Sequence, residues 1–298
     1  MKINFITVSN NMTASYRYHN EIPARVLGRL GHYVTISPFP LTWDCDVVVF
    51  SKHFNHGDIC YLEWCKSKGI KTVFHVCDHH FNTSEEQHYR TMIEGADVVV
   101  SSTEELASVI KIETGRNATV IYDPYEFDET EPEFNPEGPL KLLWFGHPTN
   151  LKALFDNWKA VEGHSVMIVS DPSVNGKIKL GGKPIPIVPY SKENLQKAMS
   201  QCDAVIIPSE LGERQRTKSP NRLVESIRRG KFVIADPLPS YQDFDKWCLI
   251  GDIKEGLDFV LTQPRESITE RISSAQRYIR ENHSPEKIGK EWEAVIGK

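Results

Sequence analysis

A helix start with cationic neighbours is the segment whose residue types point most clearly to chemistry. Residues 217–237 are TKSPNRLVESIRRGKFVIADP. Ser219 is a favourable N-cap residue, Pro220 suits the first turn of a helix, and Gly230 suits the position just past its end. The sequence therefore predicts a helix over 220–229 with a polar, cationic start.

This helix start has the charge needed to bind a phosphate or diphosphate. Lys218 and Arg222 flank it, and the N–H groups at a helix N-terminus favour an anion. Glu225 lies four residues beyond Asn221 on the same face, where its carboxylate could accept hydrogen bonds from the vicinal hydroxyls of a sugar. The alternative is a surface helix in which Arg222 and Glu225 form an ion pair.

A second polar cluster follows a predicted strand in the first half of the chain. Three interpretations stay open: a metal site, a loop whose side chains bond to the backbone, or a surface that faces a ligand. The metal site has the least support, because the spacing matches no known zinc pattern. The cluster contains His75, Asp78, His79 and His80, with His53 and His56 after an earlier strand.

Short β-branched runs alternate with amphipathic helical patterns, which predicts βαβ units and parallel sheets. Predicted strands cover 3–8, 33–36, 46–50, 71–76, 97–101, 118–122, 140–145, 165–170, 185–188, 203–208 and 231–235. Predicted helices cover 58–68, 86–94, 103–113, 151–161, 192–200, 220–229, 266–281 and 285–296, the third opened by a capping box of Ser102 and Glu105. We expect an α/β fold with two Rossmann-like doubly wound domains that face a central cleft.

One segment separates the two runs of elements. Residues 126–139, EFDETEPEFNPEGP, contain three Pro, one Gly and six acids without periodicity, so we expect a linker that joins neither core. The predicted domains are therefore 1–125 and 140–270. The C-terminal helices of 271–298 could pack back on the first domain.

Composition and charge narrow the function classes. Residues 1–135 hold 11 Lys and Arg against 19 Asp and Glu, so we expect this half to repel polyanions and nucleic acid to be an improbable partner. The six cysteines form no Cys-x-x-Cys pair, which favours reduced thiols in the core over zinc or disulfides. The absence of an apolar run of about 18 residues predicts a cytoplasmic protein.

Three motifs together resemble the family-4-like glycosyltransferases of the GT-B fold, and the resemblance spans both predicted domains. The run from Lys218 to Glu225, followed by Gly230 and Lys231, looks like the K-x-P-N-K/R-x-x-E block and following G-K-P-V-I-A strand of the donor-binding domain. LWFGHPTNLKAL at 143–154 is similar to the G-R-L-x-x-x-K-G element. Residues 15–36 are similar to the N-terminal loop and helix before G-H-x-V.

The resemblance implies a role for each aligned residue. In the first domain, which would hold the acceptor, Asp78, His79 or His80 would face the donor sugar, with Asp78 and His79 the catalytic candidates. His147 stands where the family has Arg, and Arg214 or Arg216 could supply the missing contact. The implied donor-binding residues are Gly146, His147, Lys152, Arg214, Lys218, Ser219, Asn221, Arg222 and Glu225, and the implied N-terminal loop residues are Ser9, Asn10, Ser15 and Arg17.

The expected activity is transfer of a hexose-type sugar from a nucleotide-diphosphate sugar to a saccharide or small-molecule acceptor. Cationic side chains and the helix start would stabilise the leaving diphosphate, so no metal or further cofactor is expected. Retention at the anomeric carbon is implied by the resemblance alone. The alternatives are a non-catalytic nucleotide-binding or sugar-phosphate-binding protein, and a sugar-nucleotide epimerase or hydrolase of the same fold.

Overall fold

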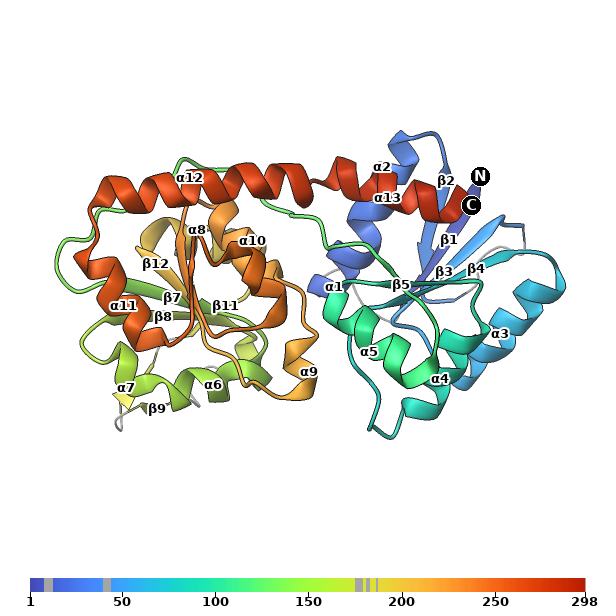
Figure 1. The fold of residues 1–298 in the computed structure, drawn as a ribbon, viewed down its shortest axis with the longest axis horizontal. Helices are drawn as coiled ribbons and strands as arrows, with labels where there is room; N and C mark the ends of the chain where they lie inside the picture. The colour runs from blue at the N-terminus through green and yellow to red at the C-terminus, as the bar shows by residue number, and fades with distance from the viewer. Residues whose placement is uncertain (8–12, 40–43, 175–178, 181–182, 186, 298) are drawn as a thin grey trace. The chain divides into compact units, whose positions relative to one another are not determined.

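The computed structural model describes residues 1–7, 13–39, 44–174, 179–180, 183–185 and 187–297 (Figure 1). The chain divides into two compact units. Unit 1 comprises Met1–Glu126, Arg216–Ser219 and Glu281–Lys298, and unit 2 comprises Phe127–Gln215 and Pro220–Arg280. Both units alternate strands and helices around a parallel sheet, which confirms the predicted α/β class.

In the described part of unit 1, six parallel strands form one sheet in the order β2-β1-β3-β4-β5-β6. The strands are β1 Lys2–Thr7, β2 Tyr33–Ser37, β3 Val47–Ser51, β4 Lys71–Val76, β5 Val98–Ser101 and β6 Thr119–Val120. The strand order changes direction between β1 and β3. Ligands of doubly wound sheets bind beyond the carboxyl ends of the strands at such a point.

Helices cover both faces of this sheet. Helices α3 His56–Ser67, α4 Glu86–Gly95 and α5 Glu104–Thr114 bury one face, where Phe50 and Phe74 meet Leu62 and Met92. Helices α2 Ile22–Arg29 and α13 Pro285–Gly297 lie on the other face and against one another (Figure 1). Before α2 run the short helix α1 Ala14–Tyr16 and the π-helix η1 Arg17–Glu21.

In the described part of unit 2, six parallel strands follow the order β11-β8-β7-β12-β13-β14, which changes direction between β7 and β12. The strands are β7 Lys141–Phe145, β8 Ser165–Ser170, β11 Ile187–Pro189, β12 Ala204–Ile207, β13 Phe232–Ala235 and β14 Leu249–Ile250, with a small antiparallel pair β9 Lys179–Leu180 and β10 Lys183–Pro184. The helices are α6 Leu151–Asp156, α7 Trp158–Val161, α8 Lys192–Gln201, α9 Glu213–Arg216, α10 Asn221–Arg228, α11 Ile253–Thr262 and α12 Arg265–Asn282, with short 3₁₀ turns η2 Pro148–Asn150, η3 Pro172–Val174 and η4 Pro239–Phe244.

Two helix predictions are wrong in detail. The helix predicted over 151–161 is split into α6 and α7 at Asn157, whose side-chain amide donates to the backbone oxygen of Ala153, 3.0 Å away. The N-cap of α5 is Thr103, because its Oγ1 accepts from the N–H of Leu106 at 3.1 Å. Ser102 therefore does not cap this helix.

Two expectations about burial also need correction. Phe127 and Phe134 of the predicted linker are buried, since these aromatic side chains pack inward between the acidic residues. All six cysteines are free, but Cys60 is exposed on α3 and Cys45 is only partly buried, so the core-thiol prediction fails for these two. Within the described ranges, no helix is both long and apolar enough to cross a bilayer.

Candidate functional site

The end of β7 in unit 2 brings Gly146 against the guanidinium of Arg222. Arg222 Nη1 lies 3.4 Å from the backbone oxygen of Phe145, to which it donates. A Cβ atom on Gly146 would lie 3.4 Å from that same Nη1 and 3.5 Å from the ring of Trp144. Gly146, which has no side chain, therefore lies next to the positive charge of Arg222. Both residues are at the carboxyl end of the sheet, where ligands bind.

Helix α10 begins one residue later than predicted. Its N-cap is Pro220, whose backbone oxygen accepts from the N–H of Val224 at 2.9 Å, and Asn221 is the first helical residue. Ser219 is therefore not the N-cap. Because proline has no polar side chain, the N-cap residue does not compete for the N–H groups of the first turn, which suits an external anion.

Lys152, in α6 after β7, forms one ion pair within its own helix and another with the loop after β12. Its Nζ lies 2.7 Å from Asp156 Oδ2 and 3.1 Å from Glu210 Oε1, and all three side chains are exposed. His147 is also exposed, and its Nδ1 accepts from the N–H of Thr149 at 3.4 Å, so it caps η2. An exposed ion pair is weak, so Lys152 can exchange its carboxylates for a phosphate at small cost.

Glu225 is not part of a surface helix. Its side chain is only 2% exposed, and Oε2 accepts from the backbone N–H of Phe127 at 3.1 Å. Arg228 is buried too and pairs with Glu129. Glu129, in the acidic segment after residue 126, therefore neutralises one positive charge of α10, while Arg214 stays exposed on α9.

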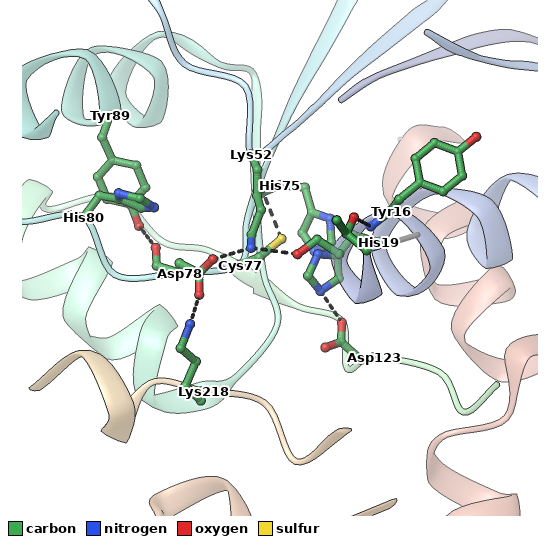
Figure 2. A network of polar contacts seen from close by, with 12 residues as sticks. Tyr16, His19, Lys52, His75, Cys77, Asp78, His80, Tyr89, Asp123 and Lys218 are labelled. Atoms are coloured by element: carbon green, nitrogen blue, oxygen red, sulfur yellow. Dashed lines mark hydrogen bonds and ion pairs between the residues drawn. The ribbon is translucent and has the colours of Figure 1, made fainter. Parts of the chain in front are cut away.

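In unit 1, the carboxylate of Asp78 lies between two ammonium groups (Figure 2). Lys52 contacts Oδ2 and Lys218 contacts Oδ1. Lys52 Nζ also donates to Ser15 Oγ at 2.9 Å. Burial acts to raise the pKa of Asp78, but the charges of Lys52 and Lys218 outweigh it and hold the pKa well below its usual range. Asp78 is therefore a stable anion in a net cationic cluster.

The histidines beside Asp78 have other surroundings. His79 is 6% exposed and lies edge-on to Phe81, with ring centroids 5.6 Å apart. His80 Nδ1 lies 3.1 Å from Glu85 Oε2. The hydroxyl of Tyr89 donates to the backbone oxygen of Asp78 at 2.8 Å, which fixes the chain at this point. Of the three candidates, Asp78 is the one in the cationic cluster.

Two other sequence candidates in unit 1, Arg17 and His53, form buried pairs that stabilise the fold. Arg17 is 4% exposed and its Nε lies 2.8 Å from Glu126 Oε1, so it forms a buried ion pair. His53 pairs with Asp58, which closes the N-terminal cap of α3. Ser9 and Asn10 lie outside the described residues.

A buried cluster lies beside Asp78, and of its members only His75 was named as a candidate from the sequence. His19 Nε2 lies 3.1 Å from Asp123 Oδ1, and the rings of His19 and His75 are edge-on at 5.1 Å (Figure 2). Burial would lower the pKa of His19, but the charges of Cys77 and Asp123 raise it to about 10. Burial would raise the pKa of Cys77, but His19 and His75 lower it to about 6.

These two shifts determine how the cluster affects stability at different pH. The pKa of His19 rises above its ordinary 6.5 on folding. Its contribution to the free energy of unfolding is therefore complete below about pH 6.5 and is lost as the pH rises through about 10. Because the pKa of Cys77 falls below its ordinary 9.0, its contribution is present above 9.0 and is lost as pH falls through about 6. Between about pH 6.5 and 9, the proton that His19 gains on folding balances the proton that Cys77 loses. Over this range the two groups together leave the free energy of unfolding independent of pH.

Among the described residues, no group of three or more His, Cys, Asp or Glu side chains is arranged to hold a metal ion. Two Asp-x-Asp triplets occur, at 44–46 and 243–245. In the first, Asp44 pairs with Lys2 and Asp46 accepts from the N–H of Lys2, at the amino end of β1. The first triplet therefore lies at the opposite edge of the sheet from Asp78.

No protein-family model and no curated protein matches the sequence, but solved structures resemble it. An alpha-glucosyltransferase solved with UDP and a 13-mer DNA containing a central A:G mismatch has 14% identity and a TM-score of 0.67, covering 100% of this chain and 99% of that one. TarM has 17% identity and a TM-score of 0.62, covering 85% of this chain and 55% of TarM. A UDP-forming trehalose-phosphate synthase from Burkholderia xenovorans has 12% identity and a TM-score of 0.60, covering 94% and 78%.

At these identities, the likeness shows the fold alone. The two parallel-sheet units match the GT-B architecture of these glycosyltransferases, which confirms the predicted fold class. The family-4 motifs are not tested by it, and this chain spans only about half the length of TarM. The comparisons do not support the expectation that nucleic acid is an improbable partner, since one similar structure contains DNA.

Proposed function

We propose that this protein is a glycosyltransferase that moves a sugar from a nucleotide-diphosphate sugar to an acceptor without a metal ion and with retention at the anomeric carbon. The observation on which the proposal depends is the arrangement of Gly146, Arg222 and the start of α10 at the point where the strand order of unit 2 changes direction. The GT-B fold and the UDP named for one similar structure support it.

The proposed chemistry follows from charge. As the bond between the sugar and the diphosphate breaks, negative charge grows on the leaving group, and donors fixed in advance stabilise it most in the transition state. We assign this role to Arg222, the N–H groups at the start of α10, and Lys152. Lys218 is also proposed to contact the diphosphate, because its side chain is 49% exposed and its pair with Asp78 is therefore weakened by solvent.

Asp78 is proposed to act beside the reacting sugar or the acceptor hydroxyl. Because it is held as an anion, it would accept a hydrogen bond or stabilise positive charge, rather than donate a proton. Glu225 is proposed to contribute by holding the chain at Phe127. The acceptor classes to screen are saccharides, small hydroxylated molecules and duplex DNA.

Thermal unfolding with nucleotides tests the donor site. Wild type is measured with UDP, GDP, dTDP, ADP and CMP, alone and as their sugars. A ligand at about 100 times its Kd stabilises by about 2.7 kcal/mol, which raises Tm by several degrees. Arg222→Met should lose most of this rise. Arg277→Met removes a positive charge from an exposed position on α12 and is the matched control.

The outcomes separate the three candidate functions. A Tm rise that Arg222→Met abolishes and Arg277→Met keeps, followed by sugar transfer in the acceptor screen, supports the proposal. Nucleotide binding with no turnover favours the binding protein. Sugar-nucleotide conversion without an acceptor favours the epimerase or hydrolase. If no nucleotide raises Tm, the proposed donor site is refuted.

A further inference from the structure

Lys52, the residue after β3, has an unusual backbone conformation. Its φ is 56°, in the left-handed region that residues with a Cβ rarely adopt. It directly follows Ser51 at the carboxyl end of β3, beside the point where the strand order of unit 1 changes direction. Strained residues at such positions suggest a functional constraint, so the contacts of the side chain need an explanation.

The Lys52 side chain links two elements that follow different strands. Its Nζ contacts Asp78 Oδ2, after β4, and donates to Ser15 Oγ, after β1, at 2.9 Å. Lys52 is 23% exposed, whereas Lys218, the other partner of Asp78, is 49% exposed. Because solvent screens exposed pairs, the Lys52 contact restrains Asp78 more strongly than the Lys218 contact does.

We propose that Lys52 is a positioning residue for Asp78, whose ammonium group fixes the orientation and the negative charge of that carboxylate during sugar transfer. This inference rests on the proposed function, in which Asp78 acts on the sugar or the acceptor. Ser15 holds the Lys52 ammonium on its other side, and Tyr89 holds the backbone of Asp78. The strained turn at Lys52 is the backbone conformation from which the side chain reaches both partners.

The charged groups around the pair agree with this role. Burial would lower the pKa of Lys52, but Asp78, Cys77 and Asp123 raise it, so Lys52 stays protonated. Lys52 and Lys218 together keep the pKa of Asp78 below its usual range. Asp78 therefore keeps its charge across the neutral range, and its action should not depend on taking up a proton there.

The first experiment measures the titration of Asp78 directly and needs no activity. Protein with ¹³C-labelled aspartate carboxyls is titrated by NMR, and Asp78→Asn identifies the resonance. Lys52→Asn removes the charge while keeping a residue that tolerates positive φ, as Asn82 does at 61°. Lys52→Gly is a second charge-free variant. Lys52→Arg keeps the charge, and Lys254→Asn, which breaks an exposed pair with Asp258, is the matched control.

The titration midpoint of Asp78 should rise by at least about one pH unit in both charge-free variants. It should stay at the wild-type value in Lys52→Arg and Lys254→Asn. An unchanged midpoint in Lys52→Asn and Lys52→Gly would overturn the proposal, because Lys218 alone would then hold Asp78. An equal rise in Lys254→Asn would also overturn it, since the effect would not be local.

The second experiment measures transfer kinetics. If Lys52 positions Asp78, kcat should fall roughly tenfold to hundredfold in Lys52→Asn, while KM for the donor stays nearly constant and Lys52→Arg restores part of the rate. A rise in KM with constant kcat would overturn the role in positioning. If wild type shows no transfer, the proposed function fails, and the NMR titration still decides whether Lys52 controls Asp78.

Discussion

Replacing Gly289 by alanine is expected to loosen α13 from unit 1. A Cβ atom at this position would lie 2.2 Å from Val26 Cγ1 and 2.8 Å from Val26 Cβ. Ordinary contact begins near 3.4 Å, so these atoms must separate by about 1.2 Å and 0.6 Å. A new rotamer of Val26 can move Cγ1, but its Cβ is fixed to the backbone of α2, so the helices themselves must move apart.

The size of the effect follows from two opposing contributions. Overpacking of this kind costs about 1 to 3 kcal/mol, because contacts such as that of Trp292 with Phe5 loosen when α13 moves. Alanine in a helix gains up to about 1 kcal/mol over glycine. We therefore expect Gly289→Ala to lower the free energy of unfolding by about 1 to 2 kcal/mol.

Gly28→Ala is the matched control. Gly28 also lies in a helix of unit 1, on the exposed side of α2, and its Cβ would meet no atom within 4 Å. This variant should gain about 0.5 to 1 kcal/mol. Urea unfolding gives both values, and hydrogen exchange in the 285–297 peptide localises the change. If both variants are equally stabilised, α13 does not pack against Val26 and the reasoning is refuted.

Three further predictions concern the site and its supports. Gly146→Ala should change the free energy of unfolding by less than about 0.5 kcal/mol, but the added methyl beside Arg222 should reduce the nucleotide-induced rise in Tm; an undiminished rise would count against the donor site. As pH rises from 9 towards 10.5, unfolding free energy measured in urea should fall as the imidazolium of His19 is lost. In Cys77→Ser the thiolate that helps to raise the pKa of His19 is gone, so the fall should occur at lower pH than in wild type, and a profile identical to that of wild type would contradict the assigned charges. Thr103→Ala should cost about 1 kcal/mol through loss of the α5 cap, measured as a lower urea midpoint, whereas Thr103→Ser should stay close to wild type.

The regular elements were predictable because their signals are local. The β-branched runs at 71–76 and 165–170 correspond residue for residue to β4 and β8. Helix ends were less predictable, since a cap depends on which hydroxyl reaches an N–H group. Thr103 rather than Ser102 caps α5, and α10 begins after Pro220 rather than after Ser219.

The candidate site was predictable only in part. Asp78 and Lys218 could each be recognised from neighbouring residues, but their ion pair joins positions 140 residues apart. Lys52 and the His19–Asp123 pair had no motif at all. Their only signals are that Lys52 follows a strand and that Asp123 follows the last strand of the first half. Which strand ends lie side by side depends on strand order, and the alternation of strands and helices does not determine that order.

The path of the chain through the two units bears on how the protein folds during synthesis. Unit 2 is complete once residue 280 has been made, whereas unit 1 also needs Glu281–Lys298. Until then, the sheet face that holds Phe5 lacks the Trp292, Ile288 and Val295 side chains that cover it. At about 5 to 20 residues per second, the first sheet waits roughly 10 to 30 seconds with an apolar face uncovered. The half of the protein that is translated first is therefore the half that finishes folding last, and it is the half in which a chaperone would find exposed apolar surface.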